Sequence, residues 1–114
     1  MSEIKTMVYH IICAYWYSGQ NVYNKSILTI FRGATKGAPV AILFKNYYFF
    51  GIRAEIDYEI IEKTTNSLVE KGIINQEYNE EEKRYHFKPA DMIMAGRVVQ
   101  YIRKNKDYLL KKYY

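Results

Sequence analysis

Apolar residues near the start of the chain recur at intervals of three and four, which is the spacing of an amphipathic helix. Gly19 is placed to end this helix in a left-handed conformation. The residues predicted to face inward are Ile4, Met7, Val8, Ile11, Ile12 and Tyr15. A second, shorter helix is predicted from Asn24, which is suited to N-capping, to Gly33. Its inward-facing side chains would be Ile27, Leu28 and Phe31.

The segment 36–51 has no single period. Gly37 and Pro39 interrupt it, and almost wholly apolar or aromatic runs follow at 40–44 and 47–50. Because proline is favoured in the first turn of a helix, one interpretation is a short helix that starts at Pro39. A buried strand is the alternative, and periodicity alone does not decide between them.

A third helix is predicted between Asp57, as its N-cap, and Gly72, which stops it. Glu59 in its first turn and Lys71 in its last turn suit the helix dipole. The side chains expected on its inner face are Ile60, Ile61, Thr64 and Leu68.

A hairpin and a last helix complete the pattern. A strand is predicted from Ile73 to Tyr78, a polar turn at Asn79–Glu82, and a returning strand over Lys83–Lys88 with Tyr85 and Phe87 on one face. Pro89 would end that strand and open a last helix, whose apolar positions are Met92, Ala95, Val99 and Ile102. Three helices followed by a two-stranded ribbon predict an α+β, mainly helical winged helix, which is a helix-turn-helix variant. We expect one such domain over residues 1–114, with a basic tail from about residue 103.

Composition is typical of one soluble domain: 114 residues, of which 49% are hydrophobic and 25% charged. The single cysteine, Cys13, lies in an apolar helical stretch and is expected to be a buried thiol. There is no signal-peptide pattern and no apolar run near the ~20 residues that span a bilayer. We therefore expect an intracellular protein without a membrane partner, in the nucleus of a eukaryote and otherwise in the cytoplasm or nucleoid.

Charge favours an anionic partner, whereas no pattern indicates catalysis. The net charge of +5 is a weak signal for binding to a polyanion. No phosphate-binding Gly-x-x-x-x-Gly-Lys-Ser/Thr loop and no hydrolase signature occurs. His10 and His86 have no acidic or cysteine partner at metal-ligand spacing. We expect no enzyme activity, no metal and no cofactor in this chain.

Three motifs follow one another between the second helix and the predicted hairpin. The segment Ile27–Ala34 is a hydrophobic helix that ends in Arg-Gly and a small residue. The segment Tyr48–Gly51 places aromatic residues before a glycine, and Leu68–Ile74 closes a helix with Gly-Ile-Ile. In this order and spacing they resemble the RQC domain of RecQ-family DNA helicases, and the similarity extends from about Val8 to about Val99.

The resemblance implies a non-catalytic domain that binds double-stranded or forked DNA near a junction and assists strand separation with its β-wing. It implies a role in DNA unwinding during replication, repair and recombination. The helicase motor and the zinc-binding module would belong to the parent protein, because this chain has no motor motif and one cysteine cannot supply the zinc ligands. Two alternatives remain open: a free-standing winged-helix transcription regulator, and a winged helix used for protein contact.

Candidate DNA contacts cluster where the second helix ends. The resemblance implies that Arg32 meets a phosphate; the alternative is that it caps the carbonyls of its own helix. Gly33 would let the backbone approach a strand, and Thr35 and Lys36 would add a hydroxyl and a charge. Two further basic candidates, one before and one on the third helix, are Arg53 and Lys63. For Lys63, a merely solvated side chain is at least as well supported.

Acidic residues set this chain apart from a base-reading winged helix. Four of them lie at the start of the third helix, Glu55, Asp57, Glu59 and Glu62, where base-reading helices carry basic and amide side chains. The turn of the wing contains Glu80, Glu81 and Glu82, whose charge Lys83 and Arg84 partly offset.

Aromatic and basic residues of the wing and tail leave further alternatives open. Tyr85 or Tyr78 would supply a stacking aromatic, against the interpretation that both tyrosines pack under the wing. The basic tail would extend the DNA contact or form a frayed, solvated helix end; its lysines are Lys104, Lys106, Lys111 and Lys112.

Overall fold

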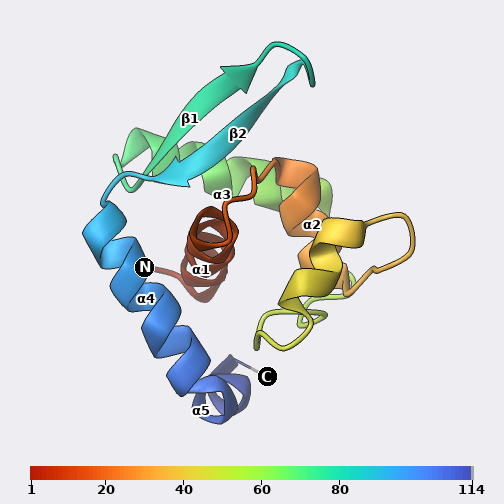
Figure 1. Ribbon diagram of the computed structural model, residues 1–114, viewed down its shortest axis with the longest axis vertical. Coiled ribbons are helices and arrows are strands. Elements are labelled where there is room, and N and C mark those ends of the chain that lie inside the picture. The colour runs from red at the N-terminus through yellow and green to blue at the C-terminus, as the bar shows by residue number, and fades with distance from the viewer. Residues whose placement is uncertain (114) are drawn as a thin grey trace.

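The structure, a computed structural model that describes residues 1–113, is mainly helical with a two-stranded antiparallel sheet (Figure 1). Its elements in order are α1 (Glu3–Tyr17), α2 (Asn24–Arg32), the 3-10 helix η1 (Pro39–Phe44), α3 (Tyr58–Glu70), β1 (Ile74–Asn79), β2 (Arg84–Pro89), α4 (Met92–Lys104) and α5 (Lys106–Tyr113). The α+β, mainly helical class is confirmed, and the arrangement is compatible with a winged helix.

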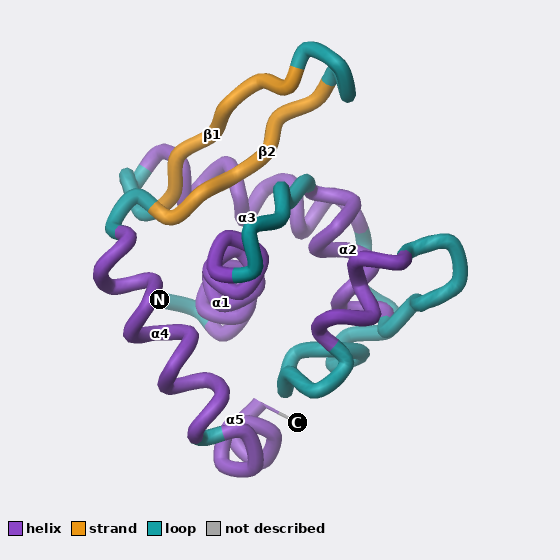
Figure 2. The backbone as a smooth tube through the Cα atoms, in the orientation of Figure 1, coloured by secondary structure: helices purple, strands orange, loops and turns teal. Residues whose placement is uncertain are grey.

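Helix α1 lies at the centre of the molecule, with α3, α4, the base of the ribbon and the α2–η1 region around it (Figures 1 and 2). Every residue from Met7 to Tyr15 is buried, so the helix is covered on all sides and not only along the predicted stripe. Cys13 is among these buried residues, as predicted. Burial raises the pKa of the Cys13 thiol to about 12, which keeps it protonated and unreactive at neutral pH.

Burial of His10 on α1 requires a hydrogen-bond partner from a distant segment. Its Nδ1 lies 2.7 Å from the hydroxyl of Tyr48. Burial raises the pKa of Tyr48, so this hydroxyl keeps its proton, and the tautomer of the imidazole sets which of the two groups donates. Burial also lowers the pKa of His10 to about 4, and the nearby Lys112 acts in the same direction.

One residue before α2, Val22, pairs with the free edge of β2 and so extends the two-stranded sheet. Within the ribbon, Ile74 pairs with Pro89 and Tyr78 with Tyr85. On the other edge of β2, the Phe87 N–H donates to the Val22 carbonyl at 3.0 Å. Strand β2 therefore lies between β1 and this one-residue bridge, which ties the ribbon to the chain that enters α2.

The segment 36–51 forms η1 followed by a run of turns, so the helix that starts at Pro39 is confirmed and the buried strand is wrong. Although its backbone is irregular, this segment packs apolar side chains into the core: Ala41, Phe44, Tyr48 and Phe49 are all buried.

Two predicted details of the helices are wrong. Tyr23, and not Asn24, caps α2, and its backbone N–H donates to Ser26 Oγ at 3.1 Å. Ile60 is 44% exposed, because the buried face of α3 is turned to include Thr65. The buried Thr65 hydroxyl is satisfied by Asn24 Oδ1 at 2.8 Å and by the Glu62 carbonyl at 3.1 Å.

The end of the chain also differs from prediction. Pro89 ends β2 as predicted, but it does not open α4, which is capped by Asp91, whose Oδ1 accepts from the Met94 N–H at 2.9 Å. The tail is not frayed over residues 106–113: Leu109 is buried and the Tyr113 ring stacks on Tyr48 with centroids 5.5 Å apart. Tyr114 lies outside the described residues.

Two glycines from distant motifs meet beyond the end of α2. Gly33 has a φ of +67°, and a Cβ placed on it would lie 3.0 Å from the Cα of Gly51. The Gly51 N–H donates to the Ile30 carbonyl at 2.8 Å, so the two backbones are held together. Close packing and a left-handed φ therefore explain the glycine at position 33, and a φ of +74° explains that at position 51.

We expect Gly33→Ala to lower the free energy of unfolding by at least about 2 kcal/mol, through its left-handed φ and the clash with Gly51. Gly37→Ala is the matched control, because Gly37 has a φ of +73° but nothing within 4 Å of its Cβ position; it should cost only about 1 kcal/mol. Urea unfolding measures both. Equal losses in the two variants would refute the close backbone contact.

We expect acidification from pH 6.5 to pH 4 to destabilise the protein by up to about 3 kcal/mol through His10. The unfolded chain binds a proton on His10 near its ordinary pKa of 6.5, whereas the folded chain does so only near 4. Stability is thus lost as the pH falls through this window. Urea unfolding across the pH range measures the slope, and His10→Asn, which keeps an acceptor for Tyr48, should flatten it. An unchanged slope in that variant would disprove the assignment to His10.

Candidate functional site

The exposed side of α2 carries a short polar stripe. Lys25, Thr29 and Arg32 are four and three residues apart and so lie on one side of the helix. The buried residues Ile27, Ile30 and Phe31 occupy the other side. The Thr29 hydroxyl donates to the Lys25 carbonyl at 2.9 Å.

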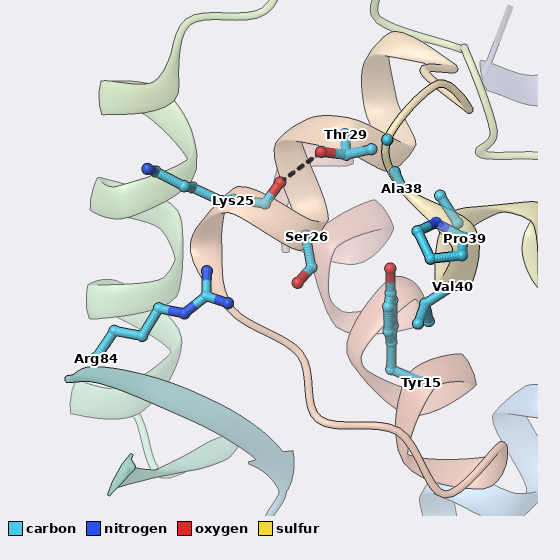
Figure 3. Close-up of a pocket in the computed structure, with 10 residues that line it drawn as sticks. Tyr15, Lys25, Ser26, Thr29, Ala38, Pro39, Val40 and Arg84 are labelled. Carbon is cyan, nitrogen blue, oxygen red and sulfur yellow. Dashed lines mark hydrogen bonds between the residues drawn. The ribbon is translucent and has the colours of Figure 1, made fainter. Parts of the chain in front are cut away.

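A hollow of about 300 Å³ opens beside this stripe, between α2, the start of η1 and the end of β2 next to the wing turn (Figure 3). We call it the α2–wing hollow. Its lining consists of Tyr15, Lys25, Ser26, Thr29, Gly37, Ala38, Pro39, Val40, Ala41 and Arg84. This lining includes two cations and three hydroxyl groups but no carboxylate.

The cation from the wing is held in place by an aromatic ring. The Arg84 guanidinium lies 3.6 Å from the centroid of the buried Tyr23 ring, and one Nη is 3.4 Å from Glu82 Oε2. In Figure 3 its side chain points from β2 towards α2. The Lys25 ammonium points away from Tyr15 in the same view, so it is placed at the rim of the hollow.

The floor of the hollow offers neutral hydrogen-bond donors. The Tyr15 ring is buried and stacks on Phe44 with centroids 4.4 Å apart, and its hydroxyl points into the hollow in Figure 3. Burial raises the pKa of Tyr15 to about 12, so this hydroxyl stays protonated. Ser26 Oγ accepts from the Tyr23 N–H, which leaves its own O–H free to donate. Such a set of donors and cations suits an anion with several oxygens, such as a phosphate group.

One asparagine anchors the turn of the wing and thereby the strand that carries Arg84. Asn79 Oδ1 accepts from the N–H groups of Glu81 and Glu82 at 3.0 and 3.1 Å. Its Nδ2 donates to the Tyr23 hydroxyl at 3.0 Å. Lys83 is exposed and closes the turn with a φ of +54°. The wing is therefore fastened to the same tyrosine on which Arg84 stacks.

A second hollow, of about 480 Å³, lies between α3 and the wing and shares Lys25 and Arg84 with the first. Tyr78 and Tyr85 line it, with exposed fractions of 49% and 51% and ring centroids 5.2 Å apart. Neither tyrosine is buried under the wing, because about half of each side chain is exposed.

The predicted contact residues at the end of α2 are accessible. Arg32 is exposed, and one Nη donates to the Ile56 carbonyl at 3.0 Å, so it caps a neighbouring segment and not its own helix. Thr35 and Lys36 are exposed in the loop that leads to Gly37 and the hollow. Gly33 faces Gly51 instead of solvent-exposed space.

Two predicted residues lie apart from this cluster. Arg53 forms an ion pair with Glu3 at 3.3 Å and does not line the hollow. Lys63 is exposed on α3, where Glu59 and Glu62 are its near neighbours along the helix.

The residues that sequence reasoning missed are Tyr15, Lys25, Ser26 and Thr29. The spacing of Lys25, Thr29 and Arg32 on one side of α2 was an available signal. No feature of the sequence predicts that Arg84 lies beside α2.

Within residues 1–113, no helix has both the length and the apolar character needed to cross a bilayer. The same residues contain no group of three or more histidine, cysteine or carboxylate side chains arranged to hold a metal ion.

We expect Asn79→Ala to destabilise the fold by about 1 kcal/mol and to speed hydrogen exchange at the Glu81 and Glu82 amides, which lose their acceptor. Asn75→Ala, an exposed change on the same strand, is the control and should leave these amides unaffected. Hydrogen exchange measured by NMR reports both. Unchanged exchange in Asn79→Ala would rule out this anchor.

Comparison of the chain with protein-family models, with curated proteins and with solved structures found no match. The assignment of a function therefore depends on the geometry described above.

Proposed function

We propose that this chain is a winged-helix domain that binds DNA through the sugar-phosphate backbone at the α2–wing hollow. The order of its helices and ribbon supports the fold, with Val22 in the place of a first strand and α3 in the place of the recognition helix. The observation that carries the function is that Arg84 from the wing and Lys25 from α2 line one hollow, together with hydroxyl groups and no carboxylate.

The distribution of charge supports an approach of DNA from the α2 side. Residues 4–54 contain six lysines and arginines and no aspartate or glutamate. A segment of this kind attracts phosphates and releases counterions when they bind. Lys36 and Arg32 continue the positive charge of the hollow along α2 and its following loop.

The acidic start of α3 supports backbone binding over base reading. Glu59 and Glu62 are exposed on this helix, and like charge would repel it from the phosphates that flank a major groove. A domain that grips phosphates from α2 and the wing does not need α3 in the groove. This favours little sequence specificity.

The exposed tyrosine pair of the wing supports binding at a fork or a duplex end. Tyr78 and Tyr85 form a T-shaped pair near the tip of the ribbon, and such rings can stack on a terminal base pair. Together with the resemblance to RQC domains, this leads us to propose a non-catalytic domain of a RecQ-like helicase that assists strand separation. The motor would lie elsewhere in the parent protein.

A second candidate function, contact with a basic protein, is favoured by the carboxylates on the other side of the wing. The wing turn contributes Glu80, Glu81 and Glu82, all of which are exposed, and α3 adds Glu59 and Glu62. A domain with this function alone would have no useful affinity for DNA at physiological salt.

Forked, blunt and single-stranded DNA of arbitrary sequence, titrated at two salt concentrations, distinguish these functions. We expect tighter binding of forked and blunt DNA than of interior duplex, with affinity that falls steeply as salt rises. Equally negligible affinity for every form would refute DNA binding and leave the protein-contact function.

We expect Lys25→Gln, Arg84→Gln and Arg32→Ala each to weaken binding of blunt DNA to a similar degree for all sequences. Each should reduce the slope of log affinity against log salt by about 1, because each removes one phosphate contact. Lys71→Gln is the control, since Lys71 is an exposed cation at the far end of α3 from the hollow. Fluorescence anisotropy at several salt concentrations measures the slopes, and a slope unchanged from that of the control would remove the residue concerned from the interface.

A further inference from the structure

The two C-terminal helices form the most basic part of the chain. Residues 97–112 contain six cations, Arg97, Arg103, Lys104, Lys106, Lys111 and Lys112, and a single carboxylate, Asp107. Ion pairs within residues 1–113 involve Arg53, Arg84, His86 and Lys88, and none of these six. Their charge is therefore available to a ligand.

A hollow of about 770 Å³ lies at the junction of these helices with the end of α1 and with η1. Its lining is Tyr17, Ser18, Leu43, Asn46, Tyr47, Arg103 and Lys106. A neighbouring hollow is lined by Gln100, Tyr101, Arg103, Lys104 and Asn105, so Arg103 belongs to both. We refer to the two together as the α4–α5 corner.

Aromatic rings form walls of the corner. Tyr17 and Tyr101 are 46% and 44% exposed, and the Gln100 amide donates to the Tyr17 hydroxyl at 3.3 Å. The Tyr47 ring is half-buried and is held by stacking on Phe49, with centroids 5.2 Å apart. These rings are positioned before any ligand binds.

The backbone at the junction is also ordered by specific contacts. Both the N–H and the side-chain Nδ2 of Asn105 donate to the Tyr101 carbonyl at 2.9 Å, which ends α4 and turns the chain into α5. Leu109 is buried and keeps α5 against the core. Arg103 and Lys106 are thus fixed on the two sides of the turn.

We propose that the α4–α5 corner binds single-stranded nucleic acid, with Arg103, Lys104 and Lys106 on the phosphates and the exposed tyrosines stacking on bases. Cations interleaved with accessible aromatic rings are the combination that single-strand binding sites use. Bases within a duplex are stacked on one another and cannot enter a hollow, whereas those of a single strand can turn into it.

This site is separate from the one that we propose for duplex DNA, because the α2–wing hollow and the α4–α5 corner share no lining residue. Its existence does not require the α2–wing hollow to bind DNA. With both sites occupied, the domain would hold a duplex and an unpaired strand at once.

The test uses the whole chain and a labelled oligothymidylate of about 12 nucleotides, within the roughly 4–16 that a single-strand site covers. We expect the double variant Arg103→Gln/Lys106→Gln to reduce the slope of log affinity against log salt by about 1.4, at about 0.7 for each phosphate contact. Its control is Lys63→Gln/Lys71→Gln, which removes two exposed charges from α3. A reduction equal to that of the control would overturn the proposal.

Variants of Tyr101 test stacking separately from charge. Tyr101→Leu should weaken oligothymidylate binding about tenfold, while Tyr101→Phe, which keeps the ring, should retain most of the affinity. Tyr101 is exposed, so neither change removes a core contact, and thermal unfolding checks that both variants fold. Equal affinity of the Leu and Phe variants would refute stacking on this ring.

Blunt duplex distinguishes the two proposed sites. The corner variants should leave blunt-duplex binding unchanged, whereas Lys25→Gln and Arg84→Gln should weaken it. Loss of duplex but not of single-strand binding in the corner variants would overturn the single-strand assignment. Duplex binding that is insensitive to Lys25 and Arg84 would refute the proposed function and leave the corner unaffected.

Discussion

The end of α2 is closed by backbone donors from a segment some 20 residues later, and the shape of the α2–wing hollow depends on this closure. The N–H groups of Gly51 and Arg53 donate to the carbonyls of Ile30 and Phe31 at 2.8 and 3.1 Å. The chain between these points is thereby held beside α2, which places the start of η1 against the α2–wing hollow. The contact between Gly33 and Gly51 is close enough to leave no room for a side chain on Gly33.

Charge is distributed along the chain in three blocks, and the fold turns them into distinct surfaces. No carboxylate occurs in residues 4–54, residues 55–82 contain nine carboxylates and two cations, and residues 83–113 contain nine cations and two carboxylates. The middle block covers α3, β1 and the wing turn, so this side repels a polyanion. Arg84, near the start of the third block and the first residue of β2, lines the hollow together with Lys25 of the first block.

The wing is held against α2 near its turn. Asn79 and Arg84, the strand pair next to the turn, both contact the buried Tyr23, which precedes α2, and Val22 pairs with Phe87 further along β2. The position of the wing is therefore coupled to α2. Tyr78 and Tyr85, one pair further from the turn, remain about half exposed.

The sequence by itself determined α1 to α4, the hairpin and the burial of Cys13, because periodicity, capping residues and turn residues act over a few neighbouring positions. Only the tertiary structure decided which face of α3 is buried, with the Thr65 hydroxyl donating to Asn24 Oδ1 of another helix. It likewise decided the bridge between Val22 and Phe87 and the position of Arg84 and Lys25 at one hollow. These residues are more than 40 positions apart in the chain, and no local preference of one specifies the other.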